Sequence, residues 1–111
     1  MQVKRRTAGS VEIVDLSGKI TIGEGDAELR REMQEMIDSG YERILLSMEK
    51  VNFMDSAGLG ELIACHKRAR EKGGTIKILK PSGKVADLFS LTKITEILEI
   101  FYDEGEAIAS F

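Results

Sequence analysis

The chain has few of the residues that provide cross-links or catalytic chemistry in a small protein. Its 111 residues include one cysteine, one histidine, one proline and no tryptophan. A single cysteine excludes an internal disulfide, and with only one histidine there are too few ligands for a zinc site. We therefore expect no metal and no cofactor, and a reducing compartment such as the cytoplasm suits the chain.

Long apolar runs and a strong charge of one sign are also missing. No stretch approaches the roughly 18 apolar residues of a membrane-spanning helix. The N-terminal segment MQVKRRTAGSVEIVDL lacks the apolar core of a secretory signal. The 16 basic residues are interleaved with 19 acidic ones, which gives no support to nucleic-acid binding. We expect a cytoplasmic protein without direct membrane or nucleic-acid contact.

What is present is an ordinary folding composition, 42% hydrophobic and 32% charged. A chain of 111 residues has the size of one domain with one core, so residues 1–111 are predicted to form a single domain. The densest basic run, HKRAREK, falls at the end of an expected helix. Cations at that end complement the helix dipole, so the run is interpreted as a solvated helix end.

Apolar periodicity predicts strands that alternate with helices. In VEIVDLSGKI, Val11 and Ile13 alternate with polar or solvent-facing positions as in a half-buried strand, and Ser17 and Gly18 are interpreted as a turn that ends the strand. The helix in GEGDAELRREMQEMIDSG has acids at its front and Gly40 behind it. The expected elements are strands at 2–7 and 11–16, that helix, a strand within 41–49, a helix from about 56 to 72, a strand at 75–80, a short helix in 81–92, a short strand within 96–103 and a last helical turn in 104–111. This alternation predicts an α/β fold with βαβ units and a largely parallel sheet.

The segment NFMDSAGLG, residues 52–60, raises the question of what Ser56 does. A nucleophile elbow needs G-x-S-x-G, but Met54 occupies the first glycine position. His66, the only possible base, lies ten residues along the same helix, roughly 15 Å away. A nucleotide-binding loop would need a lysine that DSAGLG lacks. On spacing alone Ser56 is predicted to be the N-cap of a helix, with Phe53 and Met54 in the core at the end of the preceding strand.

Loops that follow parallel strands gather at one edge of the sheet. Thr21–Glu24 and Lys80–Lys84 are therefore predicted to flank Ser56. Gly58 and Gly60 are interpreted either as small residues that permit close packing or as residues that leave a partner access to Ser56. Asp55 either orients the loop or is an ordinary solvated turn residue.

Three stretches, LSGKIT, RILLSMEKVNFMDSAGLGELI and GGTIKILKPSGKVADLFSLTKITEILEIF, resemble the STAS domain of the bacterial anti-sigma factor antagonist family. The resemblance covers nearly the whole chain, and its most specific part runs from Val51 to Gly60. It implies a mixed, mostly parallel sheet packed with about four helices. In this family the serine after the aspartate is phosphorylated, which corresponds to Ser56. One departure is Thr21, which stands where members often have an aspartate.

The resemblance implies a phosphorylation-switched binding module and not an enzyme. The unphosphorylated form would bind an anti-sigma factor that is also a serine-protein kinase, release a sigma factor and so regulate transcription. ATP would belong to the kinase, a phosphatase would reset the switch, and the chain would be a monomer or weak dimer. The candidate partner surface comprises Thr21, Gly23, Glu24, Asp55, Ser56, Ala57, Gly58 and Gly60.

Two alternatives stay open at this point. One is a STAS scaffold within a stressosome-like or other signalling complex. The other is a small serine hydrolase or a nucleotide-binding α/β protein.

Overall fold

The computed structural model describes residues 1–111 and contains five strands in one sheet. Its elements are β1 (Gln2–Ala8), β2 (Val11–Ile20), α1 (Asp26–Asp38), β3 (Arg43–Met54), α2 (Ser56–Glu71), β4 (Thr75–Leu79), α3 (Gly83–Thr92), the 3-10 helix η1 (Ile94–Glu96), β5 (Ile100–Phe101) and α4 (Glu104–Ala109). The predicted α/β fold with about four helices is confirmed.

The strands lie in the order β1-β2-β3-β4-β5, so every strand pairs with its neighbour in sequence. Strand β1 runs antiparallel to β2, while β2, β3, β4 and β5 are mutually parallel. Helices α1 and α2 connect the parallel strands β2, β3 and β4, as expected of βαβ units. The prediction of a mixed, mostly parallel sheet is therefore confirmed.

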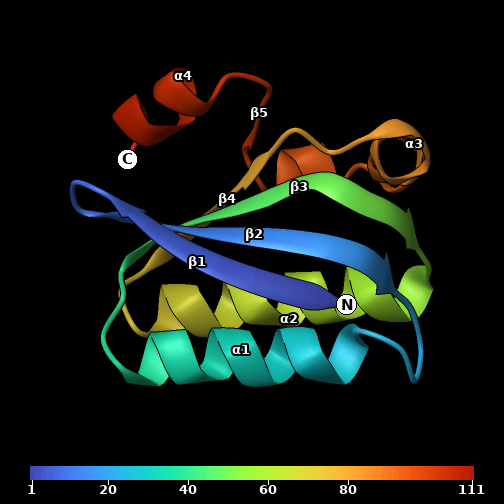
Figure 1. Ribbon diagram of the computed structural model, residues 1–111, viewed down its shortest axis with the longest axis horizontal. Helices are drawn as coiled ribbons and strands as arrows, with labels where there is room; N and C mark the ends of the chain where they lie inside the picture. Colours follow the sequence, from blue (N-terminus) through green and yellow to red (C-terminus); the bar gives the residue numbers. More distant parts are fainter.

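The core lies mainly between the sheet and the two long helices. Figure 1 shows α1 and α2 side by side on one face of the sheet, with α4 over the other face. The larger cluster has 22 buried side chains, which include Leu29 and Met33 of α1 and Leu62 of α2. A smaller cluster between the sheet and α4 contains Val11, Ile13, Leu45, Leu79 and Ala107. None of the helices combines the length and apolar character that a membrane crossing needs.

Strand β2 differs from its prediction in two ways. It continues through Ser17 and Gly18 instead of turning there, and the pairing with β3 shifts register on either side of Gly18. Gly18 has φ +97°, a left-handed conformation that glycine accepts without strain and that is typical of a bulge. The half-buried alternation is also absent at Val11–Val14, since apolar clusters cover both faces of the strand there.

Candidate functional site

The candidate site lies where β3 ends and α2 begins, at the carboxyl edge of the parallel strands. Ser56 is the first residue of α2, and its side chain is exposed. It follows Met54, which is buried in the core at the end of β3. The serine is thus presented to solvent from the junction of two rigid elements.

Asp55, and not Ser56, caps helix α2. Its carboxylate oxygen Oδ1 accepts a hydrogen bond from the backbone N–H of Gly58 at 2.9 Å, and its backbone is extended, as an N-cap requires. The prediction that Ser56 is the N-cap is wrong by one residue. Because the aspartate takes the capping role, the Ser56 hydroxyl makes no contact that the helix depends on.

Asp55 also holds the loop that follows β2. Its second oxygen, Oδ2, accepts from the N–H of Ile22 at 3.0 Å, across 33 residues of sequence. The loop itself is a tight turn, in which Thr21 and Glu24 exchange backbone hydrogen bonds of 2.6 and 3.0 Å. Gly23 is exposed at its tip with φ +74°. Thr21, Gly23 and Glu24 therefore lie beside Ser56's neighbour Asp55, as the parallel strands predicted.

The hydroxyl of Thr21, at the position where the family often has an aspartate, points back into this turn. Its Oγ1 donates to the carbonyl of Glu24 at 3.3 Å. The neutral side chain of Thr21 thus makes its hydrogen bond within the turn itself. The departure at Thr21 leaves Asp55 as the carboxylate that fastens the loop to α2.

Gly58 and Gly60 have different surroundings. Gly58 is buried, and a Cβ atom there would overlap the carbonyl oxygen of Ile20 and lie 2.9 Å from its carbonyl carbon. Gly60 is exposed, and no heavy atom lies within 4 Å of the place where its Cβ would be. Close packing therefore explains the glycine at position 58 but not the glycine at position 60. Ala57, which lies between Ser56 and Gly58 in the sequence, is half-buried.

The pKa of Asp55 lies below the usual range of an aspartate, chiefly because its carboxylate accepts from Gly58 and then from Ile22. Folding therefore lowers this pKa, and the folded state binds fewer protons than the unfolded state. The stability that the charged cap contributes is fully present above the unfolded pKa of about 3.9 and is lost as the pH falls through the lower, folded pKa.

An Asp55→Asn substitution tests whether the charge of the Asp55 carboxylate stabilises the folded chain. Asparagine still accepts from Gly58, but its amide nitrogen cannot accept from Ile22. At pH 7 the variant is expected to unfold at a lower temperature than the wild type, and the gap should begin to narrow as the pH falls below about 4. Thermal unfolding followed by circular dichroism between pH 7 and pH 3 measures the gap.

Asp87→Asn serves as the matched control, because Asp87 is exposed on α3. Its unfolding temperature should stay close to that of the wild type across the same pH range. A gap for Asp55→Asn that is constant from pH 7 to pH 3 would contradict the assigned role of the Asp55 charge.

The exposed apolar and basic side chains near the end of β3 were not identified from the sequence. Ile22 is 76% exposed and Phe53 is 40% exposed, so the prediction that Phe53 belongs to the core is wrong. The Nζ of Lys84 lies 5.8 Å from the centre of the Phe53 ring. With Lys19 and Asn52 these two residues line a shallow hollow. Phe53 alternates out of the core because neighbouring residues of a strand face opposite sides.

The segment Lys80–Lys84 divides between two places. Ser82 and Lys84 lie beside β3, because the Ser82 hydroxyl donates to the carbonyl of Val51 at 2.9 Å. Lys80 instead lines a groove with Glu104 of α4. Only the second half of the segment thus lies near the end of β3, the strand that leads to Ser56, while Lys80 lies elsewhere.

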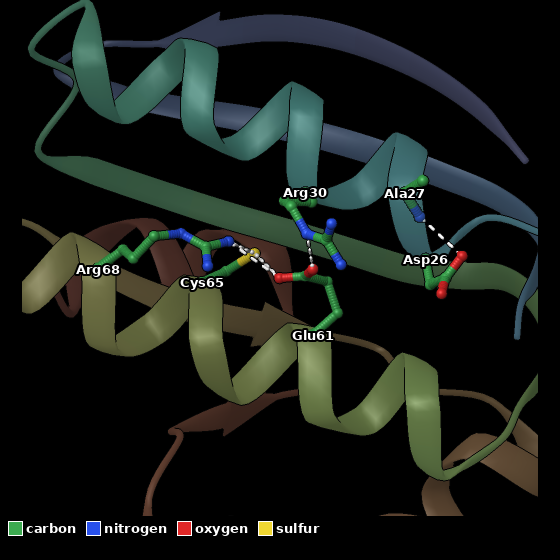
Figure 2. Close-up of polar contacts among 6 residues, drawn as sticks. All are labelled: Asp26, Ala27, Arg30, Glu61, Cys65 and Arg68. Carbon is green, nitrogen blue, oxygen red and sulfur yellow. Dashed lines mark hydrogen bonds and ion pairs between the residues drawn. The ribbon is translucent and has the colours of Figure 1, made fainter. Parts of the chain in front are cut away.

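A charged cluster joins α1 to α2 behind the site. Figure 2 shows Glu61 of α2 between Arg30 of α1 and Arg68, with Cys65 alongside. The Glu61 side chain is 5% exposed. Burial alone would raise its pKa, but hydrogen bonds from Arg68 and Arg30 outweigh burial and lower the pKa. Sequence reasoning missed this cluster and assigned Arg68 to a solvated helix end.

The structure gives no support to hydrolase chemistry at Ser56. His66 lies on α2 itself, and burial followed by the nearby Arg70 charge lowers its pKa. Burial also raises the pKa of the Cys65 thiol to about 12, so this thiol stays protonated. No three His, Cys, Asp or Glu side chains gather as a metal site would require. His66 lies ten residues beyond Ser56 on α2, roughly 15 Å along the helix axis, so it cannot serve as the base for Ser56.

The family profile of the STAS domain matches residues 2–107. The chain belongs to the STAS domain family. It is 30% identical over 109 residues to the anti-sigma F factor antagonist of Paenibacillus polymyxa, which covers 97% of this chain and 92% of that protein. Sequence similarity thus extends over both the β2 loop and the Ser56 segment.

Two solved structures of an anti-sigma factor antagonist, SpoIIAA, share the STAS fold with this chain. The unphosphorylated form matches with a TM-score of 0.78 at 21% identity, covering 96% of this chain and 93% of that one. The phosphorylated form, from Bacillus, matches with a TM-score of 0.73 at 20% identity, covering 98% of each chain. At these identities the two structures support the fold.

Proposed function

We propose that this STAS domain is an anti-sigma factor antagonist whose partner binding is switched by phosphorylation of Ser56. The observation that carries the proposal is the position of Ser56, exposed at the first residue of α2 and free of any structural role. The names of the relatives support it, since the Paenibacillus polymyxa protein is an anti-sigma F factor antagonist. SpoIIAA, which shares the fold, has been solved in a phosphorylated form.

The start of a helix suits a phosphoryl group. Unpaired backbone N–H groups and the positive end of the helix dipole favour negative charge there. Phosphoserine adds about −1.5 to −2 charge, and the dipole contributes only about 0.3–1 kcal/mol at an exposed position. Phosphorylation of Ser56 is therefore compatible with the fold of the isolated chain.

A partner that covers Ser56 responds far more strongly to the same charge. An unpaired charge enclosed in an interface costs roughly 3–5 kcal/mol, which weakens binding by about 100-fold to several thousand-fold. The surface proposed to be covered comprises the exposed Ile22, the turn at Gly23 and Glu24, and the first turn of α2. The unphosphorylated chain would bind an anti-sigma factor with serine-kinase activity and release a sigma factor. A phosphatase would reset the switch, and the cytoplasm is the compartment in which it would act.

Incubation with a cognate serine kinase and ATP, followed by phosphopeptide mass spectrometry, tests this proposal. Phosphate is expected on Ser56, with Ser56→Ala as the unlabelled control. The exposed Ser39 and Ser90 provide internal controls for nonspecific labelling. Absence of phosphate from Ser56, or its appearance only on Ser39 or Ser90, would contradict the switch and favour a scaffold role.

A further inference from the structure

A second concave surface lies on the sheet face that carries α4, away from helices α1 and α2. It is a groove of about 480 Å³. Side chains of β2 and β3 form its floor, β1 forms one wall, and the end of β4 with the start of α4 forms the other. The polar residues used below are Lys4, Arg6, Asp15, Ser17, Ser47, Glu49, Lys50, Lys80 and Glu104.

The floor of this groove is polar where the same sheet face is apolar under α4. Because alternate residues of a strand share a face, Ser17 lies on the same face of β2 as the buried Ile13, and Ser47 lies on the same face of β3 as Leu45. Ser47 is only 7% exposed, although it sits in a central strand. In this chain Ser17 and Ser47 both line the groove.

An ion-pair cluster joins the two walls of the groove. The guanidinium of Arg6 donates to Asp15 at 2.8 Å and to Glu104 at 3.0 Å. These bonds raise the pKa of Arg6, with the bond to Glu104 as the largest cause, and they connect β1 to α4. Arg6, Asp15 and Glu104 thus neutralise much of one another's charge, with one carboxylate in excess, and they connect the two walls across the floor.

The remaining charged groups of the groove are unbalanced. Lys4, Lys50 and Lys80 have no carboxylate within the 4.0 Å of an ion pair, and Glu49 is the one acid without a basic partner. Counted with Arg6, Asp15 and Glu104, the groove has four basic and three acidic side chains, a net charge of +1 in a chain whose net charge is −3. This excess of positive charge favours an anion.

The backbone conformation of Lys80 is also unusual. It has φ +50°, a left-handed conformation that is uncommon for residues other than glycine. Its N–H donates to the carbonyl of Phe101 at 2.7 Å, so this conformation is fixed where β4 ends. A glycine would adopt it without strain, yet the chain has a lysine that lines the groove.

We propose that this groove binds a small hydroxylated anion of the sugar-phosphate class. Lys4, Lys50 and Lys80 contact the phosphate, and the hydroxyls of Ser17 and Ser47 hydrogen-bond the hydroxyl groups of the ligand. Lysine binds phosphate as a point charge, and the volume lies within the range of small-molecule pockets. The site is separate from Ser56 and does not depend on the proposed switch.

Amide chemical shifts of the whole chain, followed by NMR during titration, test the proposal. The probe is glucose 6-phosphate, with inorganic phosphate and glucose as its two halves. Saturable shifts are expected at the amides of Ser17, Ser47 and Lys80, and glucose 6-phosphate should bind at least about tenfold more tightly than either half. Equal affinity for inorganic phosphate and glucose 6-phosphate would overturn the role of the serines. Absence of saturable shifts in the groove would overturn the site.

Lys80→Gly provides a variant that should fold, because glycine accepts the left-handed backbone. It is expected to lose about tenfold or more in affinity for glucose 6-phosphate, the loss of one charge-assisted contact. Lys93→Gly is the matched control, since Lys93 has φ +56° at the end of α3 and does not line the groove. Lys93→Gly should bind as the wild type does. Equal affinities of the two variants would overturn the assignment of Lys80.

Discussion

Replacing Ser56 with aspartate is expected to leave the fold intact and to weaken binding to a serine-kinase anti-sigma partner by about 100-fold or more. The side chain is exposed in the free chain, so its charge stays hydrated until a partner covers it. An acid in the first turn of a helix is favourable by about 0.3–1 kcal/mol, and the unfolding temperature should therefore stay the same or rise. Isothermal titration calorimetry and thermal unfolding measure the two effects separately.

Ser56→Asn separates charge from size in this experiment. Asparagine has nearly the shape of aspartate but no charge, so its affinity for the partner should remain within about tenfold of the wild type. A fold-preserving aspartate variant that binds as tightly as the wild type would contradict the electrostatic block. Equal losses for both variants would instead indicate that steric fit, and not charge, governs binding at Ser56.

Replacing Gly58 with alanine is expected to destabilise the chain by about 1–3 kcal/mol or more. The added Cβ would overlap the backbone carbonyl of Ile20, which cannot rotate away because β2 pairs with β3 on that side. Helix α2 must therefore shift relative to the end of β2. That shift would disturb the hydrogen bond between Asp55 and Ile22, so partner affinity should fall together with stability.

Gly60→Ala is the control, because it makes the same chemical change two residues further along α2. A Cβ there meets open space, so alanine should stabilise the helix by about 0.5–1 kcal/mol. Urea unfolding of the two variants gives the free energies of unfolding directly. If both substitutions stabilise the chain, the close approach of α2 to Ile20 is not a constraint in solution.

The proposed ligand groove and the proposed switch are held by different parts of the fold. Ser56 lies at the junction of β3 and α2, whereas the groove lies between β1 and the start of α4, on the face of the sheet that carries α4. Lys80→Gly should consequently leave phosphorylation of Ser56 unchanged. Each proposal can fail while the other holds.

Much of the local structure could be predicted because it depends on neighbouring residues. The helix at Asp26–Asp38 was predicted from acids at its front, apolar residues at helical spacing and Gly40 behind it. The start of α2 was placed correctly, but its cap was not. Aspartate and serine are nearly equal as N-caps, so DSAG alone does not choose between them. In the structure Asp55 is the cap, and its carboxylate also accepts a hydrogen bond from the N–H of Ile22, 33 residues away in the sequence.

Other incorrect predictions also concern features that depend on the tertiary structure. Ser17 and Gly18 form a turn in many sequences, but pairing with β3 keeps them within β2 as a bulge. Phe53 was assigned to the core from its hydrophobicity, while the pleat of β3 directs it outward. Glu61 was not identified as a buried group, because its burial depends on Arg30 of another helix.

The sequence by itself determined the alternation of strands and helices, the family and the position of Ser56 at the start of a helix. These follow from periodicity and from a specific motif at 51–60, both of which are local. The tertiary structure alone decided that Asp55 holds the β2 loop, that Gly58 cannot carry a side chain, and that Lys4, Lys50 and Lys80 line one groove. Each of these depends on strand order and register, which bring together residues far apart in the chain.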